Sequence, residues 1–375
     1  MRLNPALMGL SCFACGKPHE ATVLQTVCRE CGLPLRVDYD FRHITLRPAD
    51  LDERAASLWR YQEVLPIAPE DAVTLSEGYT PLLPVGENIF IKDESRNPTG
   101  SFKARGMCMA VSMARALGAK TLVAPSAGNA AGALAAYGAA AGLEVIVAMP
   151  EDTPRPFVEE CRLYGATVHL VPGHIADAGR YLHEHAPPGA FDVSTLKEPY
   201  RIEGKKTMGY ELLEQLDGRL PDVIVYPTGG GTGLVGMWKA FDEMAALGWG
   251  IERRPRIVSV QASGCAPVVS AFEAGADRTA PWPLPHTSAY GLRVPSPIGG
   301  FLCLRAIRAT QGTAISVDED EMESATRRLA ARTGLDICPE GGAAWAATER
   351  LQKSGWIRPG ETVVVFNTGT GLKYR

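Results

Sequence analysis

The chain lacks the features that would place it in a membrane or outside the cell. Its first residues, Met-Arg-Leu-Asn-Pro, contain neither the apolar stretch nor the cleavage site of a signal peptide. The longest apolar run, residues 130–150, is rich in alanine and glycine, contains Glu144 and changes from helix-forming to strand-forming composition halfway. We interpret it as a buried helix followed by a buried strand. We therefore expect a cytoplasmic protein with no membrane partner.

A basic block is also missing. Lysine and arginine number 38 and aspartate and glutamate 42, so the formal net charge is −4, and the charges are spread along the chain. A protein that follows a nucleic-acid backbone needs a basic stripe or patch. We expect a small-molecule ligand and no nucleic-acid partner.

The nine cysteines do not suit a disulfide framework, because nine is odd and five of them are scattered. The other four form two Cys-x2-Cys pairs, twelve residues apart, each followed by a glycine that permits a tight turn: Cys12, Cys15, Cys28 and Cys31. This spacing is typical of a zinc ribbon with four thiolate ligands. Chance and a redox pair are the alternatives, and two identical halves favour one closed site over both. We predict a structural Zn²⁺ in residues 1–45, in a knob that could contribute to the subunit contact of a homodimer.

The rest of the chain predicts an α/β fold. From about residue 76, short β-branched runs alternate with amphipathic helices, the pattern of doubly wound open sheets. The expected strands are 121–124, 144–149, 167–171, 222–226, 256–260 and 362–366. We expect two such domains, 76–195 and 196–375, with 46–75 joining the second.

Three expected strands run into loops of small residues, SAGN at 126–129, PTGGGTG at 227–233 and NTGTG at 367–371. Ligands bind at the carboxyl ends of strands in open α/β sheets. The glycine amides of PTGGGTG, followed by a helix, suit a phosphate. The loop lacks the Lys-Ser/Thr of a P-loop and the GxGxxG spacing, which disfavours nucleoside triphosphates and nicotinamide cofactors. A ligand-free glycine turn, and for SAGN a simple helix N-cap, are the alternatives.

The stretch NPTGSFKARG at 97–106 places Lys103 at the start of an expected helix that continues through 107–117, with Ser101 as its N-cap. The positive end of the helix dipole opposes the ammonium and favours the neutral, nucleophilic amine. A helix-start lysine, a phosphate loop, an anion loop and a hydroxyl-bearing loop together describe a site for pyridoxal 5′-phosphate (PLP) bound as a Schiff base.

From about residue 75 to the C-terminus, the chain resembles PLP enzymes of the tryptophan-synthase-β type, fold type II, and is most similar to threonine synthases. The resemblance is carried by GYTPL at 78–82, NPTGSFKARG, SAGN, YRIEGKKT at 200–207, PTGGGTGLVG, and NTGTGLK at 367–373. The family implies a lyase that converts O-phospho-L-homoserine and water to L-threonine and phosphate.

The resemblance also implies roles for single residues. Lys103 would form the Schiff base, Asn129 would contact the cofactor's ring hydroxyl, and Thr368 would meet the ring nitrogen. The cofactor's phosphate would be held by Gly229, Gly230, Gly231, Thr232 and Gly233. Ser126, Ala127 and Gly128, with Asn129, would hold the substrate carboxylate. Arg201 would contact the substrate's own phosphate.

Two departures from the family pattern keep alternatives open. Ala104 replaces the aspartate of SFKDRG, and Thr195-Leu196-Lys197-Glu198-Pro199 replaces Asn-Ser-Val-Asn-Pro. Glu198 would repel a substrate phosphate, although Lys197 could compensate. One alternative is a PLP-dependent β-eliminating dehydratase (ammonia-lyase) or a β-replacement synthase acting on a hydroxy- or phospho-amino acid. Another is a non-catalytic binding module, which would need a broken site, yet no cofactor position is missing.

Overall fold

The computed structural model describes residues 2–251 and 253–375. Its contacts divide the chain into two compact units. Unit 1 contains the chain up to Tyr79, Asn97–Thr99 and Lys103–Thr207, and unit 2 contains Thr80–Arg96, Gly100–Phe102 and Met208–Arg375. These units differ from the expected domains. Residues 46–75 lie in unit 1, and residues 80–96 lie in unit 2 because their strands pair in its sheet.

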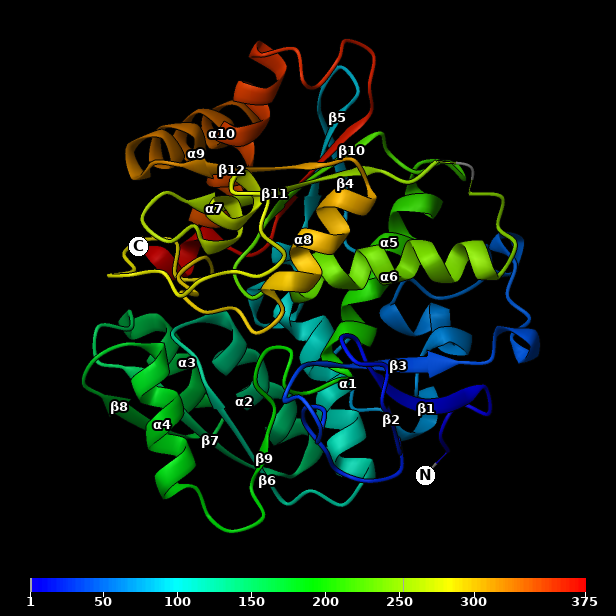
Figure 1. The fold of residues 1–375 in the computed structure, drawn as a ribbon, viewed down its shortest axis with the longest axis vertical. Helices are drawn as coiled ribbons and strands as arrows, with labels where there is room; N and C mark the ends of the chain where they lie inside the picture. Colours follow the sequence, from blue (N-terminus) through cyan, green and yellow to red (C-terminus); the bar gives the residue numbers. More distant parts are fainter. Residues whose placement is uncertain (1, 252) are drawn as a thin grey trace. The chain divides into compact units, whose positions relative to one another are not determined.

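Unit 1 contains two sheets (Figure 1). Strands β1 (Leu7–Cys12), β2 (Pro18–His19) and β3 (Leu35–Tyr39) form an antiparallel sheet in the order β2-β1-β3, which we call the cysteine ribbon together with its connecting loops, residues 7–39. Strands β6 (Thr121–Pro125), β7 (Glu144–Pro150), β8 (Thr167–Val171) and β9 (Phe191–Asp192) form a parallel sheet in the order β8-β7-β6-β9. The helices are α1 (Lys103–Ala116), α2 (Asn129–Ala141), α3 (Arg155–Leu163) and α4 (Ile175–His185), and α5 (Arg201–Gln215) begins in unit 1.

Both faces of the parallel sheet are covered, as the nearly continuous apolar composition of its strands requires. Leu122 and Val147 face a cluster that includes α1 and α2. Val123 and Ala148 face the other way, against Leu182 and its neighbours on α4.

The cysteine ribbon shares this core. Leu10, Val37 and Tyr39 belong to the same buried hydrophobic cluster as Met107 of α1 and Tyr200, which precedes α5. The ribbon is therefore packed into unit 1 and is not a separate body of residues 1–45. Four short 3-10 helices follow it: Phe41–His43, Pro48–Leu51, Leu58–Val64 and Pro69–Asp71.

Unit 2 contains a mixed six-stranded sheet in the order β12-β11-β10-β13-β5-β4, in which only β4 runs antiparallel to its neighbour. The strands are β4 (Leu82–Gly86), β5 (Ile89–Asp93), β10 (Val223–Pro227), β11 (Arg256–Ala262), β12 (Thr313–Val317) and β13 (Val363–Asn367). Helices α9 (Glu319–Thr333) and α10 (Pro339–Lys353) cover one face. Helix α8 (Gly300–Ala309) contacts β11, α6 (Thr232–Ala246) and α7 (Pro267–Glu273). Further 3-10 turns are Glu94–Arg96, Pro98–Gly100 and Gly371–Tyr374.

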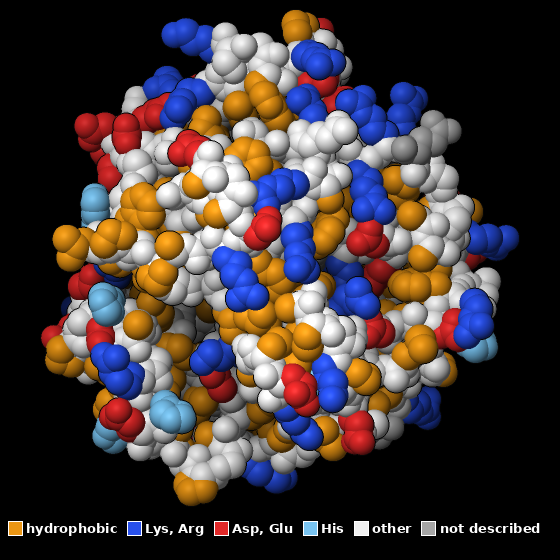
Figure 2. Space-filling view, in the orientation of Figure 1, with side chains coloured by type: hydrophobic (Ala, Val, Ile, Leu, Met, Phe, Trp, Pro, Cys, Tyr) orange, Lys and Arg blue, Asp and Glu red, His pale blue; other side chains and the backbone are white. Residues whose placement is uncertain are grey.

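All six strands expected from the sequence are confirmed within two residues, as is the helix-then-strand interpretation of residues 130–150. Within the described residues, no helix has the length and apolar character needed to cross a membrane. On the face drawn in Figure 2, Lys and Arg side chains are interspersed with Asp and Glu side chains.

Candidate functional site

The segment that precedes Lys103 pairs with the loop that carries Thr368. The N–H of Phe102 donates to the carbonyl oxygen of Thr368 at 3.0 Å, the N–H of Thr370 donates to the carbonyl of Gly100 at 2.8 Å, and Ser101 forms an antiparallel bridge with Gly369. Ser101 is therefore part of this bridge, and α1 begins two residues later, at Lys103 itself. Residues 100–102 and the NTGTG loop, distant in sequence, are therefore neighbours within unit 2.

The loop after β13 is held from several sides. The amide nitrogen of the Asn367 side chain donates to Asp93 at 2.9 Å, and its amide oxygen accepts the N–H of Cys338 at 3.2 Å. The Thr368 hydroxyl lies 3.8 Å from the Cys338 sulfur, and the residue is buried. The backbone around Thr368 is therefore held by its neighbours on both sides.

Three glycines of the loop after β10 have no room for a side chain. A Cβ atom would lie 2.1 Å from the carbonyl oxygen of Gly291 at Gly229, 2.2 Å from the sulfur of Cys303 at Gly231, and 1.9 Å from a Tyr226 oxygen at Gly233. Gly231 also has a φ of +84°, which favours glycine, and it caps α6, which begins at Thr232. The first N–H groups of a helix have no acceptor within it. A side-chain-free loop at a helix start fits a phosphate group.

The SAGN loop lies between β6 and α2. The Ser126 hydroxyl accepts the N–H of Gly128 at 3.3 Å and that of Ala131 at 3.2 Å, so it caps α2. Asn129 is the first residue of α2, and residues 127–129 are partly exposed. The N-cap position of α2 is Gly128, with Ser126 two residues before it, and Asn129 lies at the helix start, where an anion is favoured.

Glu198 has a structural role that the sequence pattern did not indicate. Its carboxylate is fully buried and accepts the N–H of Tyr200 at 3.0 Å and the N–H of Arg201 at 2.7 Å, so it caps the start of α5. Burial raises the pKa of Glu198 to about 7, although these hydrogen bonds and the charge of Arg201 oppose the rise.

Arg201 is the first residue of α5 and is only 1% exposed. Its Nη1 donates to the carbonyl oxygen of Val193 at 2.8 Å, whereas its buried Nε has no hydrogen-bond partner. Burial lowers the pKa of this guanidinium to about 10, so it is charged at neutral pH. An unsatisfied buried donor on a cation suits an acidic oxygen.

The four N-terminal cysteines come together as predicted. Their sulfurs all lie within 4.8 Å of one another, with separations of 3.4 Å for Cys12 and Cys31, 3.6 Å for Cys15 and Cys28, and 3.7 Å for Cys15 and Cys31. A zinc ion about 2.3 Å from each of four tetrahedral sulfurs would set them roughly 3.8 Å apart, so the cluster fits this metal.

The four thiols differ in pKa. A backbone hydrogen bond lowers the pKa of Cys31, but burial and the neighbouring cysteines outweigh it and raise this pKa to about 12. Burial raises the pKa of the Cys12 thiol, but hydrogen bonds from the backbone N–H groups of Cys15 and Ala14 outweigh burial and bring the pKa to about 7. None of the nine cysteines forms a disulfide.

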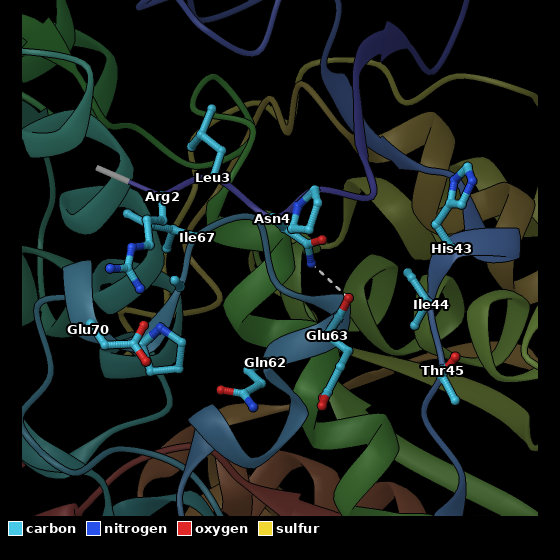
Figure 3. A pocket seen from close by; sticks show the side chains of 13 residues that line it. Arg2, Leu3, Asn4, His43, Ile44, Thr45, Gln62, Glu63, Ile67 and Glu70 are labelled. Carbon is cyan, nitrogen blue, oxygen red and sulfur yellow. Dashed lines mark hydrogen bonds between the residues drawn. The ribbon is translucent and has the colours of Figure 1, made fainter.

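A cavity of about 710 Å³ near the N-terminus was not anticipated from the sequence (Figure 3). Arg2, His43, Gln62 and Glu70 contribute to its lining, and Asn4 crosses it to donate to the carbonyl oxygen of Glu63 at 2.8 Å. None of the predicted site residues lies in its lining.

Comparison with known proteins decides the family. The model of the pyridoxal-phosphate dependent enzyme family matches residues 73–369. A threonine synthase of Methanosarcina acetivorans is 35% identical over 373 residues, which cover 97% of this chain and 92% of that protein. A threonine synthase of Methanocaldococcus jannaschii is 33% identical over 374 residues, which cover 96% of this chain and 92% of that protein. The chain belongs to the threonine synthase family of pyridoxal-phosphate dependent enzymes.

Solved structures agree with this family on the fold. A threonine deaminase from T.th. superposes with a TM-score of 0.63 at 28% identity, covering 78% of this chain and 92% of that one. A fungal L-serine ammonia-lyase from Rhizomucor miehei gives a TM-score of 0.69 at 21% identity, covering 81% and 98%. The predicted fold-type II architecture, with its open α/β sheets, is thereby confirmed.

Proposed function

We propose that this chain converts O-phospho-L-homoserine and water to L-threonine and phosphate with PLP as its cofactor. The observation that carries the proposal is the pairing of the loop before Lys103 with the loop of Thr368, in a chain 35% identical to a threonine synthase over 97% of its length. The main alternative lies within the same fold and is treated below.

Several features of the chain would hold the cofactor. Lys103 would attach it covalently, and the loop from Gly229 to Gly233 would bind its phosphate through backbone N–H groups. Asn129 would contact its ring hydroxyl, and the Thr368 hydroxyl would meet its ring nitrogen. When bound, PLP supplies an electron sink that makes the carbons next to the substrate's amino group acidic.

Lys103 would move the protons. Its amine, freed when the amino-acid substrate takes its place, would remove the proton from the α-carbon and assist removal of a second proton from the β-carbon. Phosphate would leave the γ-carbon, water would add at the β-carbon, and the two removed protons would be made good at the γ-carbon and the α-carbon, which yields threonine and phosphate. Because Lys103 is the first residue of α1, the helix dipole favours its neutral form.

The substrate would be held at two ends. Ser126, Ala127, Gly128 and Asn129, at the start of α2, would bind the carboxylate, and Arg201 would bind the phosphate through its buried Nε, which has no partner within the protein. The carboxylate of Glu198 already accepts two backbone N–H groups, which directs its charge to the start of α5 and reduces the repulsion expected from the sequence.

We further propose that Cys12, Cys15, Cys28 and Cys31 hold one structural Zn²⁺. Four thiolates fill a tetrahedral shell and leave no open position for catalysis. Nine cysteines without a disulfide are suited to the cytoplasm, where thiols stay reduced.

A β-eliminating dehydratase is the second candidate function. It is favoured by Ala104, by the altered segment 195–199 and by the likeness to a threonine deaminase. In such an enzyme the leaving group sits on the β-carbon, no γ-phosphate is needed, and the product decays to a keto acid and ammonia.

A substrate panel on the purified PLP-loaded enzyme separates the two functions. O-phospho-L-homoserine, L-serine, L-threonine and O-phospho-L-serine are each incubated with the enzyme and scored for threonine, phosphate and ammonia. We expect equal amounts of threonine and phosphate from O-phospho-L-homoserine and little ammonia from the others. Rapid release of ammonia from an unphosphorylated amino acid would favour the dehydratase.

A further inference from the structure

The cysteine ribbon is hydrogen-bonded to the first turn of the helix that carries Arg201. The Tyr200 hydroxyl donates to the carbonyl oxygen of Ala21 at 3.1 Å. The Tyr39 hydroxyl, at the end of β3, donates to Oε2 of Glu203 at 2.9 Å. Tyr200 and Glu203 lie on either side of Arg201 in the chain, so the ribbon contacts this helix start both before and after Arg201.

These contacts are buried, and three of the side chains involved, Tyr39, Glu203 and Lys206, contact one another. Lys206 donates to the same Glu203 oxygen at 2.6 Å, and its Nζ lies 4.5 Å from the centre of the Tyr39 ring. Glu203 and Lys206 are fully buried, and Tyr39 and Tyr200 nearly so. In such surroundings a hydrogen bond fixes geometry more firmly than at the surface, because no water can replace it.

Two of the predicted metal ligands flank the segment whose Ala21 carbonyl accepts the Tyr200 hydrogen bond. Ala21 lies in the loop between the two cysteine pairs, so Cys15 and Cys28 tie both of its ends to the same cluster. Within this loop, the two-residue strand β2 supplies the sheet pairing, and Nε2 of His19 lies 3.4 Å from the Cys28 sulfur. A metal bound to all four sulfurs would therefore hold the Ala21 carbonyl in place.

A displacement of Tyr200 would also displace Arg201, its neighbour in the chain. Glu198 accepts the backbone N–H groups of both residues, which joins them into one rigid helix start. A displacement of a binding group by about 1 Å can cost on the order of a hundredfold in rate. A small shift of the ribbon is therefore sufficient to alter binding at Arg201.

We propose that Tyr39 and Tyr200 are positioning residues through which the metal-loaded cysteine ribbon sets the place of Arg201 and, with it, the affinity for the phosphorylated substrate. This inference rests on the proposed function, because it assumes that Arg201 binds the substrate phosphate. It assigns the ribbon a task in substrate binding, whereas the spacing of its cysteines indicated a structural knob alone.

The test removes single hydroxyl groups. We expect Tyr39→Phe and Tyr200→Phe each to raise KM for O-phospho-L-homoserine about three- to tenfold, the range of one hydrogen bond, with kcat and the cofactor's visible absorbance unchanged. Equilibrium binding of a phosphonate analogue, in which a methylene replaces the ester oxygen, should weaken by the same factor. This second readout does not depend on turnover.

Tyr210→Phe is the matched control. Tyr210 lies on the same helix and donates to Glu243 at 2.8 Å in a buried site, away from the hydrogen bonds that join the ribbon to α5. Its loss should lower the melting temperature about as much as the other two substitutions and leave KM and analogue binding unchanged. An equal rise of KM in this variant would show that helix stability, and not the ribbon, controls affinity, and would overturn the proposal.

Zinc removal links the effect to the metal. A chelator that strips zinc from the wild-type enzyme should raise KM, and it should add little in the Tyr39→Phe/Tyr200→Phe double variant, because the connection is already broken. If both single variants keep the wild-type KM while Arg201→Ala raises it strongly, the ribbon proposal is wrong and the proposed function stands. If Arg201→Ala itself leaves KM unchanged, the assignment of Arg201 fails and the ribbon proposal fails with it.

Discussion

The N–H of Phe102 donates to the carbonyl oxygen of Thr368, and this one bond joins two loops that lie far apart within the family match. It fixes the residue immediately before Lys103 against the loop proposed to meet the cofactor's ring nitrogen. This short pairing also includes Ser101 and Gly369.

Lys103→Ala should abolish turnover and the visible absorbance band of the bound cofactor, because no other amine is proposed to attach it. Absorbance spectra and reduction with borohydride, followed by mapping of the modified peptide, check this. Lys120→Ala, an exposed lysine elsewhere in unit 1, should behave like the wild type. A borohydride-reducible adduct on another lysine of the Lys103→Ala variant would contradict the assignment.

Gly231→Ala should weaken cofactor binding, because the new Cβ would lie 2.2 Å from the Cys303 sulfur and force the phosphate loop to move. Gly118→Ala is a matched control, since Gly118 has a similar positive φ, +89°, and nothing within 4 Å of the added Cβ. The control should lose about 1 kcal/mol of stability from backbone strain and retain its cofactor. Dialysis followed by titration with PLP measures the difference, and equal retention in both variants would argue against the phosphate loop.

Glu198 should make the enzyme less stable as the pH rises from about 4.5 to about 7. Its pKa rises from 4.5 to about 7 on folding, so in this range the folded state binds the proton and the unfolded state has lost it. The stabilisation is complete below pH 4.5 and is lost as the pH rises through 7, by on the order of 3 kcal/mol. Glu198→Gln should remove this part of the pH dependence. Denaturant midpoints at pH 5, 6 and 7 for both proteins test it, and parallel curves would contradict it.

Freshly purified protein should contain one zinc per chain, bound by the four clustered thiolates. Cys12→Ser should lose the zinc and melt at a lower temperature while the absorbance of the bound cofactor stays intact, because the cysteines take no part in holding PLP. Metal analysis with a melting curve and a spectrum checks all three points. Protein that is free of zinc as purified, or a variant with a bleached cofactor, would count against this account.

The sequence predicted the elements whose pattern is local. The six expected strands are largely apolar because helices cover both faces of their sheets. Strand β5 escaped notice because Lys92 and Asp93 interrupt its pattern, and the fold buries this lysine in an ion pair with Glu211 at 2.6 Å. Such pairing depends on a residue far along the chain and leaves no periodic signal.

In the site, too, local motifs could be predicted from the sequence, whereas contacts between distant residues could not. Loops at strand ends and the cysteine spacing could be recognised as motifs, and the cysteines indeed come together. The bond from Tyr39 to Glu203, by contrast, joins residues 164 positions apart, and no pattern in either segment indicates it. Glu198 was interpreted by its charge alone, whereas its capping of α5 depends on the local backbone.

The most direct test of the proposed reaction is the fate of oxygen in water enriched in the heavy isotope. The enzyme is given O-phospho-L-homoserine in this water, and both products are examined by mass spectrometry. If phosphate leaves the γ-carbon with its ester oxygen and water adds at the β-carbon, threonine will carry one heavy oxygen in its hydroxyl group and the released phosphate will carry none. Heavy oxygen in the phosphate, with unlabelled homoserine as the other product, or ammonia with a keto acid in place of threonine, would contradict the account.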